Sequence, residues 1–161
     1  MRALLVDEQR QLLLLIQMRV PDTGKLIWLA PGGGVEAGET PLQALAREVF
    51  EETGLRIDFA CESVIKPISG PVWKRRMQFV LHGRRWDQAE SYYYVPVPAF
   101  TPDHRHNPAT AEQATFRAFR WWSYPEIAAA TDQIFVPLAL AQHFQNLLQM
   151  PLPDAPIDVG R

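Results

Sequence analysis

The sequence has a single cysteine, no apolar run long enough to cross a membrane and no strong excess of charge of one sign. Cys61 alone cannot form an internal disulfide, so we expect a reducing, cytoplasmic location. The apolar run Leu12 to Ile16 is far shorter than the ~20 residues that span a bilayer. We interpret this run as a buried strand and expect no membrane partner.

The charge balance also limits the partners. Sixteen lysines and arginines against eighteen acidic residues give a net charge of −2. Affinity for nucleic acid needs a basic excess, so we expect a small-molecule partner and no nucleic acid. With 161 residues, of which 47% are hydrophobic, the chain predicts a single domain over residues 1–150 and a proline-rich tail over 151–161, frayed or docked on a partner.

A helix is specified at both ends between Thr40 and Gly54. Thr40 is a suitable N-cap, Pro41 suits the first helical position, and Gly54 can adopt the left-handed conformation that ends a helix. Between these ends an apolar stripe recurs at three- and four-residue spacing: Leu42, Leu45, Ala46, Val49 and Phe50. We expect this stripe to face a core.

Three glutamates, Glu48, Glu51 and Glu52, share another face of the same helix. Like charges at these spacings destabilise a helix by roughly 0.2–0.5 kcal/mol per pair, and a merely solvated face would be better served by interleaved lysines. Carboxylates are the ligands that Mg²⁺ and Mn²⁺ prefer. The glycine run Gly32 to Gly34 before the helix lets bare backbone approach a metal or a phosphate, and its carbonyls are further candidate ligands.

The segment from Gly33 to Leu55 reads G-x5-E-x7-R-E-V-F-E-E-T-G-L and resembles the Nudix box at every position. The resemblance implies the α/β Nudix fold, an α/β/α sandwich with a mixed central sheet. It also implies a hydrolase that splits a diphosphate linked to a moiety X with Mg²⁺ or Mn²⁺ as cofactor.

The resemblance further implies roles for individual residues. The metal ligands would be the Gly32 carbonyl, Glu48, Glu51 and Glu52, and the support of the box would come from Gly33, Glu39, Arg47 and Gly54. The candidates for the general base are Glu52, then Glu51, then a carboxylate from outside the box. For that last position we favour Glu112 slightly over Glu90.

The rest of the chain predicts a sheet and two more helices. Strands are expected at Ala3–Val6, Leu12–Gln17, Ile27–Ala30, Arg56–Ile65, Val72–His82, Glu90–Val97 and Thr115–Trp122, and helices near Pro125 and over Pro137–Gln149. The first two strands should form a hairpin. The fifth and sixth should form an antiparallel ribbon joined by the segment GRRWDQA and should wall the substrate cleft.

Four residues of this ribbon are candidate substrate contacts: Arg75, Arg84, Glu90 and Tyr93. Guanidinium groups match phosphate oxygens, although a solvated basic patch is an equally good interpretation. Tyr92, Tyr93 and Tyr94 must alternate between the two faces of the strand. One face should be core, and the other should meet a base or a second subunit, which makes a homodimer possible.

The predicted function is metal-dependent cleavage of a phosphoanhydride in a nucleoside diphosphate derivative. A nucleoside triphosphate or related nucleotide is the first substrate class, and ADP-ribose or a nucleotide sugar is the second. A Nudix-fold module that senses a nucleotide without cleaving it is the alternative from another class. Loss of box glutamates would indicate such a module, and none is lost.

Overall fold

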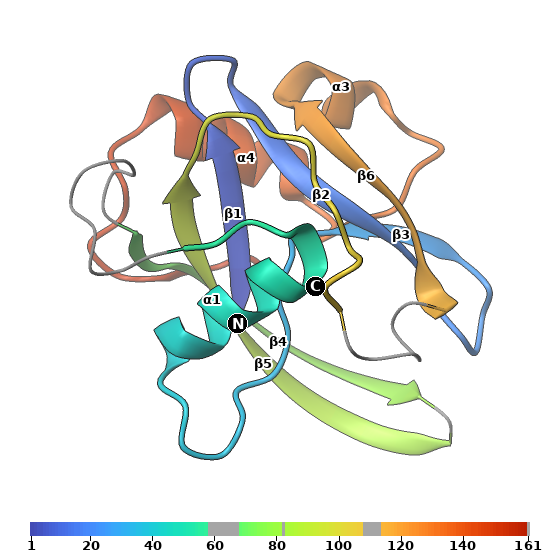
Figure 1. Ribbon diagram of the computed structural model, residues 1–161. Coiled ribbons are helices and arrows are strands. Elements are labelled where there is room, and N and C mark those ends of the chain that lie inside the picture. The colour runs from blue at the N-terminus through green and yellow to red at the C-terminus, as the bar shows by residue number, and fades with distance from the viewer. Residues whose placement is uncertain (58–67, 82, 108–113, 161) are drawn as a thin grey trace.

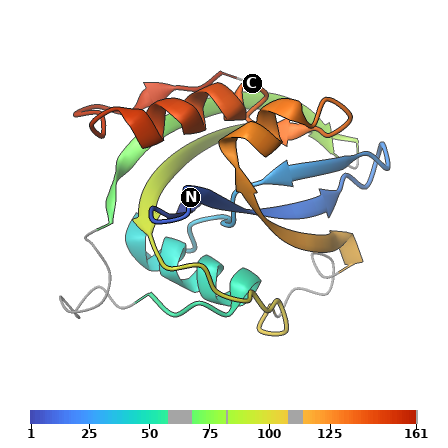
Figure 2. The same ribbon diagram turned by 90° about the horizontal axis from the view of Figure 1, so that it is seen from above.

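The computed structural model describes residues 1–57, 68–81, 83–107 and 114–160. A curled mixed sheet lies between two helical layers, with α1 (Pro41–Thr53) on one face and α3 (Tyr124–Ala129) and α4 (Leu140–Gln149) on the other (Figures 1 and 2). The α/β/α architecture with a mixed sheet is therefore confirmed. None of the helices in the described ranges is long and apolar enough to cross a membrane.

The strands are β1 (Arg2–Asp7), β2 (Leu12–Arg19), β3 (Leu26–Leu29), β4 (Ser69–Leu81), β5 (Arg84–Pro96), β6 (Phe116–Ser123), β7 (Phe135–Val136) and β8 (Ile157–Asp158). Six of these strands in the described ranges correspond to predicted strands, and β7 and β8 were not predicted. Their order in the sheet is β7-β3-β2-β1-β5-β4-β8, and β6 pairs with β2. The strand predicted at Arg56–Ile65 falls mostly on residues outside the described ranges.

The β1–β2 hairpin and the antiparallel β4–β5 ribbon are confirmed. The segment GRRWDQA was predicted to be the connection between the two strands. This prediction is wrong, because all of the segment after Gly83 belongs to β5. Arg84 pairs with Leu81 and Trp86 pairs with Phe79, so the ribbon extends much further than expected. It projects from the body of the molecule (Figure 1).

The sheet opens where β1 and β2 separate. The two strands pair only at Val6 with Leu13 and Asp7 with Leu12, next to their turn. Further along, β1 pairs in parallel with β5 and β2 pairs with β3. The loop after β3 enters this opening, where the Ala3 N–H donates a 2.7 Å hydrogen bond to the Pro31 carbonyl. The glycine run is thereby held between the two halves of the sheet.

Two apolar cores fill the sandwich, one on each face of the sheet. Leu4, Leu15, Trp73 and Phe144 belong to the core beneath α3 and α4, and Leu5, Leu14, Leu45 and Val49 belong to the core beneath α1. Both cores take tyrosines from β5. Tyr92 and Tyr94 enter the first and Tyr93 enters the second.

The expectation that one tyrosine face would be open is therefore wrong. Tyr93 is only 8% exposed because α1 covers that side of β5, so it is not available to a substrate or to a second subunit. When both faces of a strand are covered, the alternation of its side chains does not indicate which of them are exposed to solvent. One of the two reasons for expecting a homodimer is thus removed.

The C-terminal tail is docked on the chain's own sheet at β8 and is not frayed there. β8 pairs in parallel with β4 at Trp73 and Lys74, and the Val159 N–H donates to the Lys74 carbonyl at 3.0 Å. Val159 is buried in the core beneath α4. The tail therefore covers an edge of the sheet of its own chain.

Truncating Val159 should destabilise the fold. Val159→Ala removes two buried methyl groups from a closed core, so we expect the free energy of unfolding to fall by about 1.5 kcal/mol in urea titrations. The matched control is Ile157→Ala, because Ile157 lies in β8 with half of its surface exposed. Equal losses from the two variants would contradict the packing described for the tail.

Candidate active site

Helix α1 is fixed in rotation by its ends and by its buried stripe. Thr40 Oγ1 accepts from the Gln43 N–H at 3.3 Å, Gln43 Oε1 accepts from the Thr40 N–H at 2.8 Å, and Gly54 has φ +75°. Leu45 and Val49 are fully buried against the sheet. With that stripe facing the core, Glu48 and Glu52, which flank the stripe, reach the glycine run.

Gly33 lies directly against Glu48. A Cβ at position 33 would stand 2.5 Å from the carboxyl carbon of Glu48, and the Glu48 side chain is itself buried. Contacts below 3.0 Å force a displacement, so only glycine fits here without moving the carboxylate. At Gly34, in contrast, an added Cβ would meet nothing within 4 Å among the described residues.

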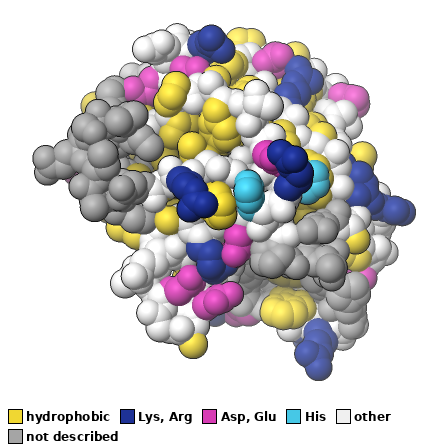
Figure 3. Space-filling model, viewed as in Figure 1, with side chains coloured by type: hydrophobic (Ala, Val, Ile, Leu, Met, Phe, Trp, Pro, Cys, Tyr) yellow, Lys and Arg dark blue, Asp and Glu magenta, His cyan; other side chains and the backbone are white. Residues whose placement is uncertain are grey.

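Arg47 connects the acidic side chains to one another and to the loop. Its Nε and Nη2 donate to Glu39 at 2.8 and 3.0 Å, and its Nη1 donates to Glu48 at 2.8 Å and to Glu51 at 3.2 Å. The Arg47 hydrogen bonds lower the pKa of Glu39 to about 2. Acidic and basic side chains accordingly lie side by side over α1 (Figure 3). This geometry supports the bracing role expected for Glu39 and Arg47.

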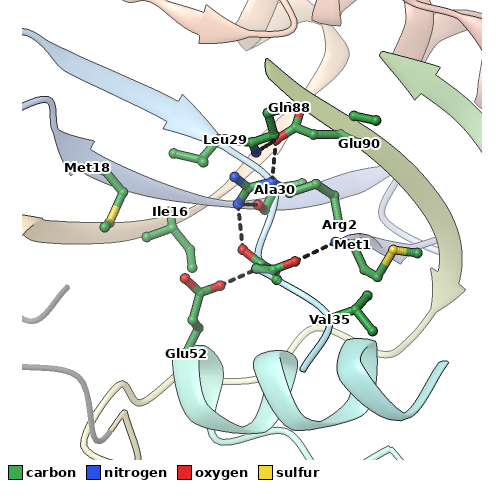
Figure 4. Close-up of a pocket in the computed structure, with 14 residues that line it drawn as sticks. Met1, Arg2, Ile16, Met18, Leu29, Ala30, Val35, Glu52, Gln88 and Glu90 are labelled. Carbon is green, nitrogen blue, oxygen red and sulfur yellow. Dashed lines mark hydrogen bonds and ion pairs between the residues drawn. The ribbon is translucent and has the colours of Figure 1, made fainter. Parts of the chain in front are cut away.

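The glycine run is bound to the helix and to the first two residues of the chain (Figure 4). Glu52 Oε2 accepts from the Gly32 N–H at 2.6 Å, and the Gly32 carbonyl accepts from Arg2 Nη1 at 2.6 Å. The Gly33 carbonyl accepts from the Met1 ammonium group at 2.5 Å. The carbonyl oxygens of the glycine run, which were candidate ligands for a cation, thus face positively charged groups of the protein, whereas Glu52 accepts from a backbone N–H.

Glu90 is the centre of a second, buried charge cluster. Its carboxylate accepts from Arg2 Nε at 3.0 Å and from the Tyr92 hydroxyl at 2.8 Å. Arg75 Nε lies 2.8 Å from the same carboxylate, but its N–H is not aligned with the oxygen, so this contact is an ion pair only. Burial raises the pKa of Glu90, and the charges of Arg2 and Arg75 outweigh this effect and leave the pKa below its usual value.

Two of the predicted phosphate contacts are corrected by this geometry. The Arg75 side chain is only 4% exposed and is committed to Glu90, so it does not present its guanidinium group to solvent. Arg84 lies at the exposed tip of the ribbon, six residues from Glu90 along β5, which is about 20 Å. The positions of Arg75 and Arg84 are determined by the long-range pairing of β4 with β5. The composition of the sequence does not indicate either position.

A cleft of about 400 Å³ lies between these two clusters. Its polar lining includes Arg2, Glu52, Gln88 and Glu90, and its apolar wall includes Ile16, Met18, Leu29 and Val35. The lining is thus mixed, and clefts of this size with apolar side chains and a few convergent polar groups are typical of small-molecule sites. Sequence reasoning missed Arg2 and Gln88, which no local motif marks.

The donor set fits a hard divalent cation by its chemistry. Glu48, Glu51 and Glu52 supply carboxylate oxygens, and Gly32, whose carbonyl is the fourth candidate ligand, is hydrogen-bonded to Glu52 through its N–H. In the arrangement described, these oxygens engage protein donors, and no group of three or more acidic, histidine or cysteine side chains in the described ranges is gathered as a ready metal site. Glu112, the favoured carboxylate from outside the box, lies outside the described residues.

Comparison with known proteins gives a consistent result. The model of the NUDIX domain matches residues 1–140. An RNA pyrophosphohydrolase of Rhodopseudomonas palustris is 30% identical over 59% of this chain and 55% of its own length. A diphosphoinositol polyphosphate phosphohydrolase 2 of Rattus norvegicus is 44% identical over 31% of this chain and 26% of its own. The chain thus matches about half of the first relative and about a quarter of the second.

Among solved structures, the E. coli dihydroneopterin triphosphate pyrophosphohydrolase aligns with a TM-score of 0.59. The alignment covers 92% of each chain at 19% sequence identity. At this identity the likeness establishes the fold.

Adding one methyl group at Gly33 should distort the site, whereas the same change at Gly34 should not. We expect Gly33→Ala to lower the free energy of unfolding by about 1–3 kcal/mol, because Glu48 or the loop must move. Gly34→Ala should raise it slightly, because a Cβ is accommodated and the unfolded chain loses freedom. Chemical denaturation of both variants checks this, and a cost at Gly34 equal to that at Gly33 would contradict it.

Neutralising Glu90 should leave the buried Arg75 and the partly buried Arg2 without their counter-charge. We expect Glu90→Gln to destabilise the protein by about 3–5 kcal/mol at pH 7. Because folding lowers the pKa of Glu90, its contribution is present above its unfolded pKa of about 4.3 and is lost as the pH falls through its lower folded value.

The acid-dependent part of the unfolding free energy should therefore shrink in Glu90→Gln when denaturation is measured between pH 7 and pH 3. Asp87→Asn is the control, because Asp87 belongs to the same strand and pairs with Arg76 in solvent. It should leave stability nearly unchanged. An unaltered pH profile in Glu90→Gln would show that this cluster does not carry the effect.

Proposed function

Because the chain belongs to the NUDIX family, we propose that it is a metal-dependent hydrolase that cleaves a phosphoanhydride bond of a nucleotide. The observation that carries the proposal is the acidic face of α1, which meets the glycine run at the mouth of the cleft. Three carboxylates on one face of a helix repel one another and lower its stability. A diphosphate with a bound divalent cation is the kind of ligand that such a site suits.

We assign the metal to Glu48, Glu51, Glu52 and the Gly32 carbonyl, with Mg²⁺ or Mn²⁺ as the cation. When bound, such a cation offsets charge on phosphate oxygens and lowers the pKa of a bound water. Glu52 is the first candidate to accept a proton from the attacking water, because its carboxylate lines the cleft. Glu51 is the second candidate.

Glu90 is a poorer general base than these two. Its carboxylate is buried, accepts several hydrogen bonds and has a lowered pKa, so it binds a proton weakly. Its proposed role is to hold Arg2, whose guanidinium group in turn binds the Gly32 carbonyl. Glu90 would thereby position the loop and would not take part in proton transfer.

The proposed substrate is a nucleoside triphosphate or a related nucleotide. Ile16, Met18 and Leu29 form an apolar wall against which a base can pack, and the Gln88 amide adds a polar group at the rim of the cleft. The name of the R. palustris relative denotes a pyrophosphohydrolase that acts on RNA, and that of the R. norvegicus relative denotes one that acts on an inositol compound, so both names support cleavage of a phosphoanhydride. ADP-ribose or a nucleotide sugar remains the second class. The single cysteine supports a cytoplasmic location.

The test is release of product from a substrate panel in the presence of Mg²⁺, Mn²⁺ or a chelator. The panel contains nucleoside triphosphates, ADP-ribose, a nucleotide sugar and a diphosphoinositol compound. We expect metal-dependent cleavage of the triphosphates. Binding of nucleotides without cleavage under every condition would overturn the proposal and would favour the sensing module.

Replacing Glu52 should abolish most turnover without unfolding the chain. Glu52→Gln keeps the side-chain volume and removes one charge, so we expect kcat to fall on the order of 10²- to 10⁴-fold while the thermal midpoint stays close to that of the wild type. Glu36→Gln is the matched control, because Glu36 is an exposed residue of the loop before α1. Retained turnover in Glu52→Gln would contradict the assignment of Glu52.

A further inference from the structure

Gln88 lines the cleft on the side of the buried charge cluster (Figure 4). The side chain is partly buried, and it is the only uncharged polar side chain in the described lining. Glu52 lies on the other side of the cleft, where it binds the glycine run. A ligand that places its phosphates at the acidic face of α1 therefore directs its remote end toward Gln88.

The orientation of the Gln88 amide follows from the group that it binds. Gln88 Nε2 donates to Glu90 Oε1 at 2.9 Å. An ionised carboxylate can only accept hydrogen bonds, so an amide that binds one turns its NH2 group toward it and its oxygen away. Burial raises the pKa of Glu90, but the charges of Arg2 and Arg75 outweigh burial and hold that pKa below its usual value. Glu90 is therefore ionised at neutral pH, and the opposite orientation of the amide is excluded.

The amide oxygen of Gln88 is thereby a fixed hydrogen-bond acceptor of the cleft. Glu90 is itself held by Arg2 Nε at 3.0 Å and by the Tyr92 hydroxyl at 2.8 Å, so the group that orients Gln88 is fixed too. Within the described ranges, no residue donates to the Gln88 oxygen. An acceptor that cannot turn stabilises a ligand N–H and is left unsatisfied by a ligand carbonyl, because the amide cannot exchange its two ends.

We propose that Gln88 is a specificity-determining residue, which selects a base with an amino group on its outer edge over the same kind of base with a carbonyl there. The inference rests on the proposed function, because the base has to pack against the apolar wall with its phosphates at the acidic face. The edge of the base remote from the sugar then meets the amide oxygen. Adenine and cytosine carry an amino group on that edge, whereas hypoxanthine and uracil carry a carbonyl at the same position.

The test compares matched pairs of nucleotides. Steady-state kcat/KM is measured with Mg²⁺ for CTP against UTP and for ATP against ITP, because the members of each pair differ only on this edge. Wild type should prefer the amino member of at least one pair by about 5- to 50-fold, because the carbonyl member leaves one partly buried polar group unsatisfied. The pair that responds shows whether the cleft takes a purine or a pyrimidine.

Two variants assign the preference to Gln88. Gln88→Met has a similar length and no amide oxygen, so the kcat/KM values of the two members should fall within about twofold of one another. Gln88→Lys places a donor where the oxygen was, so the preference should reverse toward the carbonyl member, which a merely structural role would not produce. Glu90 keeps its arginine and tyrosine partners in both variants, and thermal midpoints check that both are folded.

Gln78→Met is the matched control for this change. Gln78 is exposed on the same ribbon and pairs with Asp87, in the row next to that of Gln88. The variant replaces an amide by a thioether in the same way but outside the cleft. It should keep the preference of the wild type.

Three results would overturn the role of Gln88 while leaving the proposed function intact: no preference for the amino member in wild type, a preference that Gln88→Met retains, or no reversal in Gln88→Lys. If wild type cleaves none of the four nucleotides, their dissociation constants are measured by calorimetry in the presence of a chelator. Tighter binding of an amino member that Gln88→Lys reverses would support the inference although the proposed function had failed. Binding without this pattern, or no binding of any of the four, would overturn both.

Discussion

Negative charge on one face of a helix destabilises the helix unless other groups offset it, and the residues around α1 supply such groups. Arg47 binds Glu39, Glu48 and Glu51 together, and Glu52 accepts from the backbone of Gly32. Because Gly33 has no side chain, the Glu48 carboxylate can lie directly against its backbone. The arginine, the glycine and the four carboxylates form one electrostatic unit, in which each member is needed because of the others.

The opening in the sheet allows this unit to meet a substrate. If β1 and β2 stayed paired along their length, the loop after β3 would have no place between them. The two strands are apart before Val6 on β1 and beyond Leu13 on β2, which lets the loop enter. Arg2 holds the loop through the carbonyls of Ala30 and Gly32. Arg2 is itself held by Glu90, so the buried cluster on β5 and the acidic face of α1 act on the same loop from two directions.

Features that depend on neighbours in the sequence were predictable, and features that depend on distant pairing were not. The caps at Thr40 and Gly54 are local and were predicted. Of the predicted apolar stripe of α1, Leu45 and Val49 are buried, whereas Leu42 is exposed. The role of Arg75 depends on its pairing with Glu90 across the ribbon, and the burial of Tyr93 depends on which face α1 covers. Docking of Val159 requires a strand pair some eighty residues apart in sequence. No periodicity within one segment carries such information.

The central claim is that the acidic face of α1 exchanges its protein cations for a divalent metal. Calorimetric titration of Mn²⁺ into wild type, Glu48→Gln and Glu52→Gln tests it most directly. We predict saturable binding to the wild type and at least a tenfold weaker affinity in each variant, with all three proteins folded. The same affinity in all three, or no binding to the wild type, would contradict the claim.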